Sequence, residues 1–320
     1  SVLSVAEALT NIVWAPLSEG LDSVSLSANW MWPCKNPGED ARLYKAVEAC
    51  SRFACELGIN IPTGKDSLSM TQKYGDEKVY SPGTVIISAG AEVSDVKKVV
   101  SPVLVRDART AVYYIDFSFD ALSLGGSAFA QSLGKVGCQA PTVQDSEYFA
   151  SAFNAIQQLI SEGLILAGHD ISAGGMITAL LEMNFANTEG GLEVKLDKLP
   201  EKDLIKILFS ENPGVLIQVK DRKAVEKILE EAGVGYAVVG HPCSERHILV
   251  SKDGAEYLFG IDHLRDVWFS SSYLLDRKQS GEAQAKARFL NYKEQPLHYH
   301  FGKSFTGKME QYGISADRRK

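Results

Sequence analysis

Cysteine, basic charge and long apolar runs are all scarce in this sequence of 320 residues. Its five cysteines are odd in number and form no CxxC pair, which argues against a zinc site or a disulfide framework and favours reduced thiols in the cytoplasm. The formal charge of −7 excludes a general nucleic-acid binder. No apolar run approaches the roughly 20 residues of a transmembrane helix, so we expect no membrane association.

What is present is the composition of a globular protein, with 45% hydrophobic and 23% charged residues, and a length that predicts about two domains. The first of these covers residues 1–100 and is expected to be α+β, with mostly antiparallel strands. The patterns predict helices at 1–13 and 37–58, strands at 22–30, 67–74 and 79–93, and a loop between the second helix and the second strand.

Strands and helices alternate from about residue 101 to residue 265, and this alternation predicts a second, layered α/β domain. The stretch 266–320 has few periodic apolar residues and is expected to be a helix and a linker. The sequence starts inside a helical pattern and its polar tail ends in ADRRK, so we expect it to be a segment of a longer chain.

Residues 169–175, HDISAGG, lie between an apolar run and a helical pattern. One interpretation is a helix start at which Asp170 or Ser172 caps the first free N–H groups. The other is that the positive end of the helix receives a phosphate together with a metal ion. The motif alone leaves both interpretations open.

Glu7 and Asn11 in EALTN are one helical turn apart, so their side chains share a face of the predicted helix. Oxygen ligands of this kind suit Mg²⁺ better than zinc. Asp170 would be the natural third oxygen ligand if the two domains fold over each other. A solvated helix face is the alternative interpretation.

The tetrapeptide GKDS at 64–67 lies in the expected loop. It does not meet the P-loop pattern, because Ile59 stands where the first glycine belongs and Asp66 follows the lysine. The loop could still hold an anion with Lys65 and Ser67, and an ordinary turn into a strand explains it as well.

A second glycine turn, LGGSAFAQ at 124–131, would bring a strand into a helix and suits either close packing or the approach of a phosphate. The histidines show no ligand spacing, and no Ser-His-Asp or Cys-His set stands out. Taken one by one, these motifs leave phosphate and metal binding open beside their structural interpretations.

Taken in order, EALTN, SANWM, PGED, IPTGKDSLSM, SPGTVIISA, LGGSAFAQ and HDISAGGMITALLEM resemble one family, the large single-chain phosphoribosylformylglycinamidine synthases. The similarity runs through nearly the whole chain. It includes the tail from Gln295, which resembles the linker that precedes the glutaminase domain of that family.

The resemblance implies two domains of the AIR-synthetase type. Residues 1–100 would be the N-terminal-type domain, mostly antiparallel, lacking its first strands and able to pair with a partner into a shared barrel. Residues 101–265 would be the layered C-terminal-type α/β domain, and 266–320 the helix and linker toward an absent glutaminase domain. We therefore expect an inactive fragment and, without its natural partner, a homodimer through the first domain.

The implied activity is the ATP- and glutamine-dependent conversion of formylglycinamide ribonucleotide to formylglycinamidine ribonucleotide in purine biosynthesis. ATP would activate the formamide oxygen, and glutamine-derived ammonia would then displace phosphate with the help of Mg²⁺. The remaining domains of the complete enzyme would be further partners. The catalytic nucleophile would lie outside this chain.

The resemblance also implies a structural Mg-ADP site. Its metal ligands would match Glu7, Asn11 and Asp170, with Ser172 contacting the nucleotide. Gly64, Lys65 and Ser67 match in position a loop that contacts the substrate and the catalytic Mg-ATP.

Two alternatives stay open. A kinase of the same superfamily would carry an Asp- and Gly-rich nucleotide loop near its N-terminus, and nothing like it precedes residue 38. A non-catalytic module for nucleotide binding or assembly would have the fold with a degenerate pocket.

Overall fold

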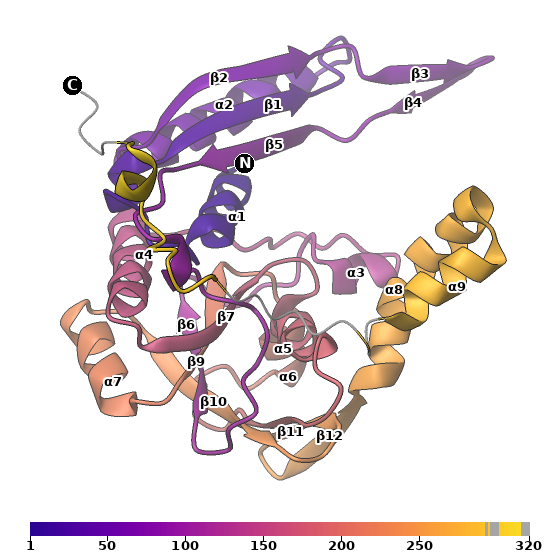
Figure 1. Ribbon diagram of the computed structural model, residues 1–320. Coiled ribbons are helices and arrows are strands. Elements are labelled where there is room, and N and C mark those ends of the chain that lie inside the picture. The colour runs from indigo at the N-terminus through magenta and orange to yellow at the C-terminus, as the bar shows by residue number, and fades with distance from the viewer. Residues whose placement is uncertain (292–293, 295–300, 315–320) are drawn as a thin grey trace.

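The computed structural model describes residues 1–291, 294 and 301–314 and places two sheets one above the other (Figure 1). The upper part contains α1 (Val2–Ile12), η1 (Gly20–Ser23), β1 (Ser25–Met31), α2 (Glu39–Glu56), β2 (Asn60–Ser67), β3 (Thr71–Tyr74), β4 (Glu77–Tyr80), β5 (Thr84–Gly90) and η2 (Val96–Lys98). Its main sheet has the order β2-β1-β5, while β3 and β4 form a separate hairpin that projects from the body.

The lower part begins with β6 (Ala111–Asp116). It continues with α3 (Ala128–Ser132), α4 (Ser146–Ser161), β7 (Ile165–Ile171), α5 (Gly175–Phe185), β8 (Gly191–Lys195), α6 (Leu204–Phe209), β9 (Gly214–Val219), α7 (Arg222–Glu231), β10 (Tyr236–Cys243), β11 (His247–Lys252) and β12 (Ala255–Gly260). The chain then forms α8 (Ile261–Ser280), α9 (Glu282–Leu290) and, further on, η4 (Met309–Tyr312).

The lower sheet has the order β12-β11-β8-β10-β6-β9-β7. Although helices alternate with strands along the sequence, only the pair β8–β11 is parallel among the described strands of this sheet. The layered α/β arrangement is as expected. No strand in the described ranges belongs to both sheets, so residue 100 does separate two sheets.

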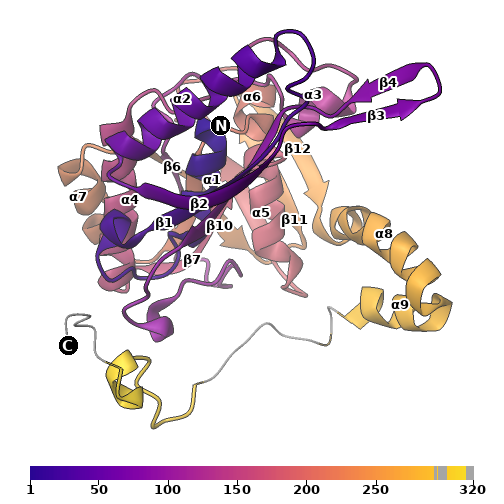
Figure 2. The ribbon, with the colours of Figure 1, turned by 90° about the horizontal axis from the view of Figure 1, so that it is seen from above.

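One hydrophobic core nevertheless joins the two parts. Leu9 on α1 and Phe53 on α2 are buried in the same cluster as Phe149 on α4 and Ile217 on β9. The rings of Phe53 and Phe149 meet edge to face, with centroids 5.5 Å apart. Seen from two directions, α1 lies between the small sheet and the lower part (Figures 1 and 2). This packing brings Glu7 of α1 close to the end of β7.

A second core fills the opposite face of the large sheet, where α5 and α6 pack. Leu180 on α5, Ile207 on α6 and Leu216 on β9 are among its buried residues. The two faces of the sheet are thus covered by different helices, as a layered fold requires. Among the described residues, no helix combines the length and the apolarity needed to cross a membrane.

The structure corrects several local expectations. The stretch with GKDS is not a loop but strand β2, paired in parallel with β1 through a register that sets Gly64 opposite Ala28. The first strand starts at Ser25 rather than residue 22, because a 3-10 turn precedes it. The region 67–93 holds the three strands β3, β4 and β5 rather than two. Strand β2 was not predicted, because buried and exposed side chains do not alternate along it.

The region 266–320 was expected to be a helix and a linker. It begins within helix α8, which starts at Ile261, and a second helix, α9, follows. Its apolar residues are largely exposed, which is why periodicity was a weak signal there. Residues 295–300 and 315–320, which carry much of the tail resembling the family linker, lie outside the described residues.

Candidate functional site

Glu7 on α1 and Asp170 on β7 come together where α1 crosses the end of the large sheet. Burial raises the pKa of the Glu7 carboxyl, and the negative charges of Asp170 and Glu211 raise it further. Burial also raises the pKa of Asp170, although His169 acts in the opposite direction. The negative charges that act on Glu7 are ones that a bound cation would offset.

The HDISAGG motif suggested that Asp170 lies at a helix start. It is instead the next-to-last residue of strand β7, within the part that pairs with β9. It pairs opposite Val215 of β9 and is only 8% exposed. Its position is therefore fixed by the sheet ladder rather than by a flexible loop. A ligand on a strand is held more rigidly than one on a loop, which favours a defined site.

His169 lies between two carboxylates that sequence reasoning did not connect. Its Nδ1 is 2.8 Å from the backbone oxygen of Asp170 and 3.6 Å from Oδ1 of the same residue. Its Nε2 is 3.4 Å from Oε2 of Glu182 on α5. The imidazole thereby lies between the carboxylates of Asp170 on β7 and Glu182 on α5. No spacing in the sequence indicated Glu182, because its partner is 13 positions earlier on another element.

A cavity of about 240 Å³ lies beside these carboxylates. Glu7 and Thr10 line it from α1, Ser172 and Ala173 line it from the turn after β7, and Glu211 lines it from the turn before β9. The structure therefore brings the predicted residues Glu7 and Ser172 to one cavity. Asp170 borders the turn that lines it, whereas Asn11 is an exposed residue of α1 and is not among the lining residues.

The glycine turn LGGSAFAQ borders the same cavity. Gly125 and Gly126 line it, and a Cβ on Gly125 would lie 2.2 Å from the carbonyl oxygen of Gln139. Gly126 has a φ of +78°, which glycine adopts without strain. LGGSAFAQ therefore serves close packing and also borders the cavity. The segment before it is irregular and not a strand, which differs from the expectation.

Glu211 is the main residue that sequence reasoning missed. Its Oε1 accepts hydrogen bonds from the backbone N–H of Ala128 at 2.7 Å and from that of Gly174 at 2.9 Å. Helix α5 has no capping hydrogen bond from a side chain at its N-cap, Gly174, so the interpretation that Asp170 or Ser172 caps it is wrong. One carboxylate instead ties the starts of α3 and α5 together at the wall of the cavity.

The glycines of HDISAGG have a structural reason as well. Gly174 and Gly175 both have positive φ, +89° and +73°. A Cβ on Gly175 would lie 2.6 Å from the carbonyl oxygen of Leu208, which is backbone and cannot move aside cheaply. The double glycine therefore lets α5 start directly after β7, with its first N–H groups near the cavity.

Gly64, Lys65 and Ser67 lie elsewhere, on strand β2 of the small sheet, and none of them lines this cavity. Lys65 Nζ donates a hydrogen bond of 2.7 Å to Ser67 Oγ on the exposed surface. A Cβ on Gly64 would lie 2.0 Å from the carbonyl oxygen of Ala28, so this glycine has a packing role in the strand pair.

The donor set fits Mg²⁺ in its chemistry, because Glu7, Asp170 and Asn11 offer oxygen atoms. In the part of the chain that the structure describes, no cluster of three or more His, Cys, Asp or Glu side chains has metal-binding geometry. A site with two carboxylates and an amide would leave the remaining positions to water and phosphate, as Mg²⁺ commonly does.

The chain is similar to known proteins over most of its length. Residues 1–92 match the family described as FGAR-AT PurM_N-like domain, and residues 117–251 match the C-terminal domain of AIR synthase related proteins. The human phosphoribosylformylglycinamidine synthase is 37% identical over 310 residues, which are 95% of this chain. A probable enzyme of the same name from Arabidopsis thaliana is 37% identical over 282 residues, or 87% of this chain.

The chain belongs to the phosphoribosylformylglycinamidine synthase family. It spans about a fifth of these relatives, 23% of the human protein and 20% of the plant one. The resemblance that the motifs carried is thus confirmed for the family.

Solved structures confirm the expected fold of two AIR-synthetase-like domains. The T. maritima PurL complexed with FGAR aligns with a TM-score of 0.61 and 16% identity, over 82% of this chain and 42% of that one. The hydrogenase maturation protein HypE in complex with ATP aligns with a TM-score of 0.58 and 16% identity, over 81% and 78%. At such identities the likeness extends to the fold alone.

Proposed function

We propose that this chain is the second AIR-synthetase-like half of a phosphoribosylformylglycinamidine synthase. The complete enzyme would be a ligase of purine biosynthesis that uses ATP, formylglycinamide ribonucleotide and glutamine-derived ammonia. In that reaction the formamide oxygen takes a phosphoryl group from ATP, ammonia adds to the carbon, and phosphate leaves to give the amidine. The curated relatives that carry this name support the assignment.

Within that enzyme we assign to this chain a structural Mg-ADP site. Glu7, Asn11 and Asp170 would hold Mg²⁺, and Ser172 would contact the nucleotide. The observation that carries the proposal is the cavity that Glu7 and Ser172 share, with the buried Asp170 beside it and the first N–H groups of α5 close by. Solved PurL complexes with ATP and ADP have the same fold, which supports a nucleotide as the ligand.

When bound, Mg²⁺ would neutralise the phosphate oxygens and the carboxylates around them. The residues of the chain would supply the rest. The pairing of β7 with β9 fixes the backbone of Asp170, and the His169 ring contacts the backbone oxygen of Asp170. Ser172 offers a hydroxyl to a phosphate oxygen. The main-chain N–H groups at the start of α5 favour negative charge there.

Lys65 and Ser67, together with Gly64, remain our proposal for contacts with the substrate and the catalytic Mg-ATP. They would act across the interface with another domain, since they lie on the open sheet β2-β1-β5. The same sheet is the proposed interface for a homodimer or for the other AIR-synthetase-like half. We also propose the cytoplasm as the compartment, which suits five free thiols, although one plant relative is named chloroplastic/mitochondrial.

Equilibrium dialysis tests this assignment. The chain should retain ADP in the presence of Mg²⁺ and lose it when EDTA replaces the metal. With Mg-ATP, formylglycinamide ribonucleotide and ammonium chloride it should form no amidine by itself. Absence of Mg-ADP binding would favour an assembly module with a degenerate pocket, and ATP consumption with phosphorylation of a small molecule would favour a kinase.

A further inference from the structure

A second and larger cavity, of about 750 Å³, opens in the lower part of the molecule. It lies between α5 and α6, the first residues of β10, and two loops that follow β6 and β8. Its size is that of a pocket for a small organic ligand. Ile171 is the one residue that lines both this cavity and the smaller one, so the two are separate sites.

The inner walls of this cavity are largely apolar, with two aromatic rings. They are formed by Tyr114, Leu122, Met176, Leu199, Ile207, Tyr236 and Ala237. The hydroxyl of Tyr236 is directed out of the cavity, since it donates to Oε1 of Glu230 at 2.9 Å. Such walls suit a flat apolar or heteroaromatic group and offer little to a free inorganic ion.

The aspartates at the rim are occupied by the loop that carries them. Asp116 accepts hydrogen bonds from the backbone N–H groups of Ser118 and Phe119. Asp120 accepts from the backbone N–H groups of Ala121 and Thr142. These carboxylates therefore shape the loop and are not waiting for a cation.

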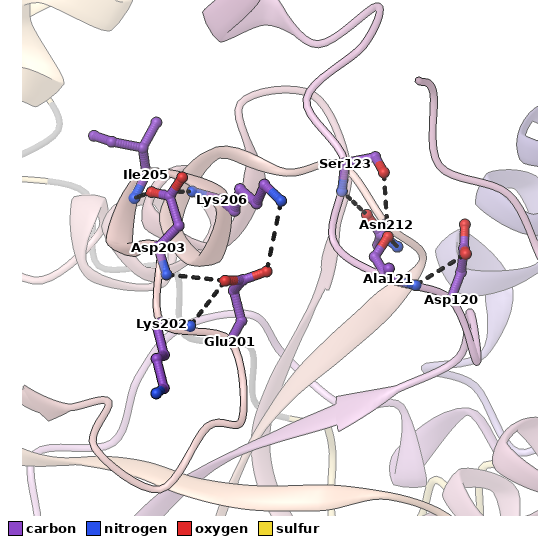
Figure 3. Close-up of polar contacts among 9 residues, drawn as sticks. All are labelled: Asp120, Ala121, Ser123, Glu201, Lys202, Asp203, Ile205, Lys206 and Asn212. Atoms are coloured by element: carbon purple, nitrogen blue, oxygen red, sulfur yellow. Dashed lines mark hydrogen bonds and ion pairs between the residues drawn. The ribbon is translucent and has the colours of Figure 1, made fainter. Parts of the chain in front are cut away.

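The same holds for Glu201 on the facing loop. Its Oε1 accepts from the backbone N–H groups of Lys202 and Asp203 at 2.8 and 2.9 Å, and its Oε2 is 3.8 Å from Lys206 Nζ. Figure 3 shows the two sides of the rim, with Asp120 and Asn212 on one side and Glu201 and Lys202 on the other.

Two lysines of the rim remain without a counter-charge. The side chains of Lys198 and Lys202 both line the cavity, and neither makes a hydrogen bond or ion pair within the described residues. In Figure 3 the side chain of Lys202 extends away from Glu201. Since the rim carboxylates are satisfied by backbone donors, the free hydrogen-bonding capacity at the mouth is cationic.

One polar group inside the cavity is also without a partner. Ser210 lines the cavity and is only 4% exposed, yet its hydroxyl forms no hydrogen bond with any described residue. A hydroxyl that lines a cavity and has no partner in the protein is free to bond a ligand or a water molecule there. Ser210 thus marks a position where a ligand would need a polar atom within an otherwise apolar body.

We propose that this cavity binds a heteroaromatic monophosphate, such as a nucleoside monophosphate. Its ring would lie against the apolar walls with a ring nitrogen or amino group on Ser210. Its phosphate would sit at the mouth on Lys198 and Lys202. Apolar walls, one unpartnered hydroxyl on the cavity wall and two unpaired cations are together what such a ligand requires.

Isothermal titration of the full chain with AMP in the presence of EDTA tests the proposal, because EDTA suppresses the Mg-dependent site. AMP should bind at least tenfold more tightly than adenosine or inorganic phosphate, each of which carries one half of the ligand. The double variant Lys198→Gln/Lys202→Gln should weaken AMP binding at least fivefold, and Ser210→Ala should weaken it about threefold. A double change at the exposed lysines Lys195 and Lys223 to Gln is the matched control and should leave binding unchanged.

The location is checked with Ser172→Ala, which changes the smaller cavity and should leave AMP binding in EDTA intact. The proposal is overturned if AMP binds no better than its two halves, or if Ser172→Ala abolishes binding while the rim variant does not. Circular dichroism of each variant confirms that the fold is retained. Binding of Mg-ADP is measured separately, so a failure here leaves the proposed structural site untouched.

Discussion

Glu211 Oε1 accepts a hydrogen bond of 2.9 Å from the backbone N–H of Gly174, which lies 37 positions earlier in the sequence. The same oxygen accepts a hydrogen bond of 2.7 Å from the backbone N–H of Ala128. Removing the carboxylate in Glu211→Ala leaves two N–H groups without their charged acceptor. We expect the free energy of unfolding to fall by about 1–3 kcal/mol. Hydrogen exchange should also become faster at Gly174 and Ala128. The exposed Glu48→Ala is the control, and equal exchange rates in both variants would contradict this role of Glu211.

Asp170→Asn should weaken Mg-ADP binding at least tenfold while keeping the fold. Burial raises the pKa of the Asp170 carboxyl, and its negative charge raises that of Glu7, so the ligand-free variant should be no less stable than the parent at pH 7. Dialysis with Mg-ADP and urea unfolding give the two readouts. Asp22→Asn, at an exposed position, is the matched control. Unchanged Mg-ADP affinity in the Asp170 variant would remove it from the metal site.

Gly64→Ala should destabilise the pairing of β1 with β2. The added Cβ would lie 2.0 Å from the carbonyl oxygen of Ala28, and backbone cannot yield as a flexible side chain does. A loss of about 1–3 kcal/mol is typical of such overpacking. Thermal unfolding measures it, with Gly75→Ala as a comparison in the open turn of the hairpin, where only the positive φ opposes the change. An unchanged melting temperature for Gly64→Ala would show that the register is wrong.

Alkaline pH should destabilise the protein in a way that depends on Tyr113. Burial, followed by the hydrogen bond to Glu226, raises the pKa of this phenol to about 12. An unfolded chain ionises its tyrosines near pH 10, so between about pH 10 and 12 the folded state holds more protons and stability falls as pH rises. The drop in unfolding free energy from pH 9 to pH 11 should be smaller in Tyr113→Phe than in the parent.

An equal drop in Tyr113→Phe and in the parent would contradict the assignment to Tyr113. The control is Tyr44→Phe, because Tyr44 is 69% exposed on α2. Urea titrations at both pH values give the unfolding free energies. The quantity compared is the drop in unfolding free energy from pH 9 to pH 11 in each protein. Absolute stabilities are not compared, since other groups titrate in the same range.

Self-association should depend on the small sheet. Ile86 on β5 is 50% exposed, whereas its neighbour Ile87 packs against the core, so one face of this strand is open. Ile86→Glu places a charge on that face and should shift the proposed dimer to monomer at tens of micromolar in sedimentation velocity. Val136→Glu, at a residue 70% exposed in the lower part, should not. A parent chain that is monomeric at this concentration would contradict the dimer.

Local patterns in the sequence determined the helices and most strands. The 3.6-residue period placed α1 and α2 close to their observed bounds, because an amphipathic face depends on the spacing of nearby residues. The one-turn spacing of Glu7 and Asn11 and the double glycine before α5 are local signals of the same kind. They indicated a site near the start of α5, and the cavity with Ser172 lies there.

Tertiary structure alone decided the rest. Strand β2 exists because β1 pairs with it along its length, and its own residues show no alternation in burial that a pattern could detect. Glu211 reaches the site across 37 positions, and the larger cavity is assembled from residues 114 to 237. Hydrogen bonds and walls between distant segments depend on how the layers pack, and that packing is a property of the whole chain rather than of any window in it.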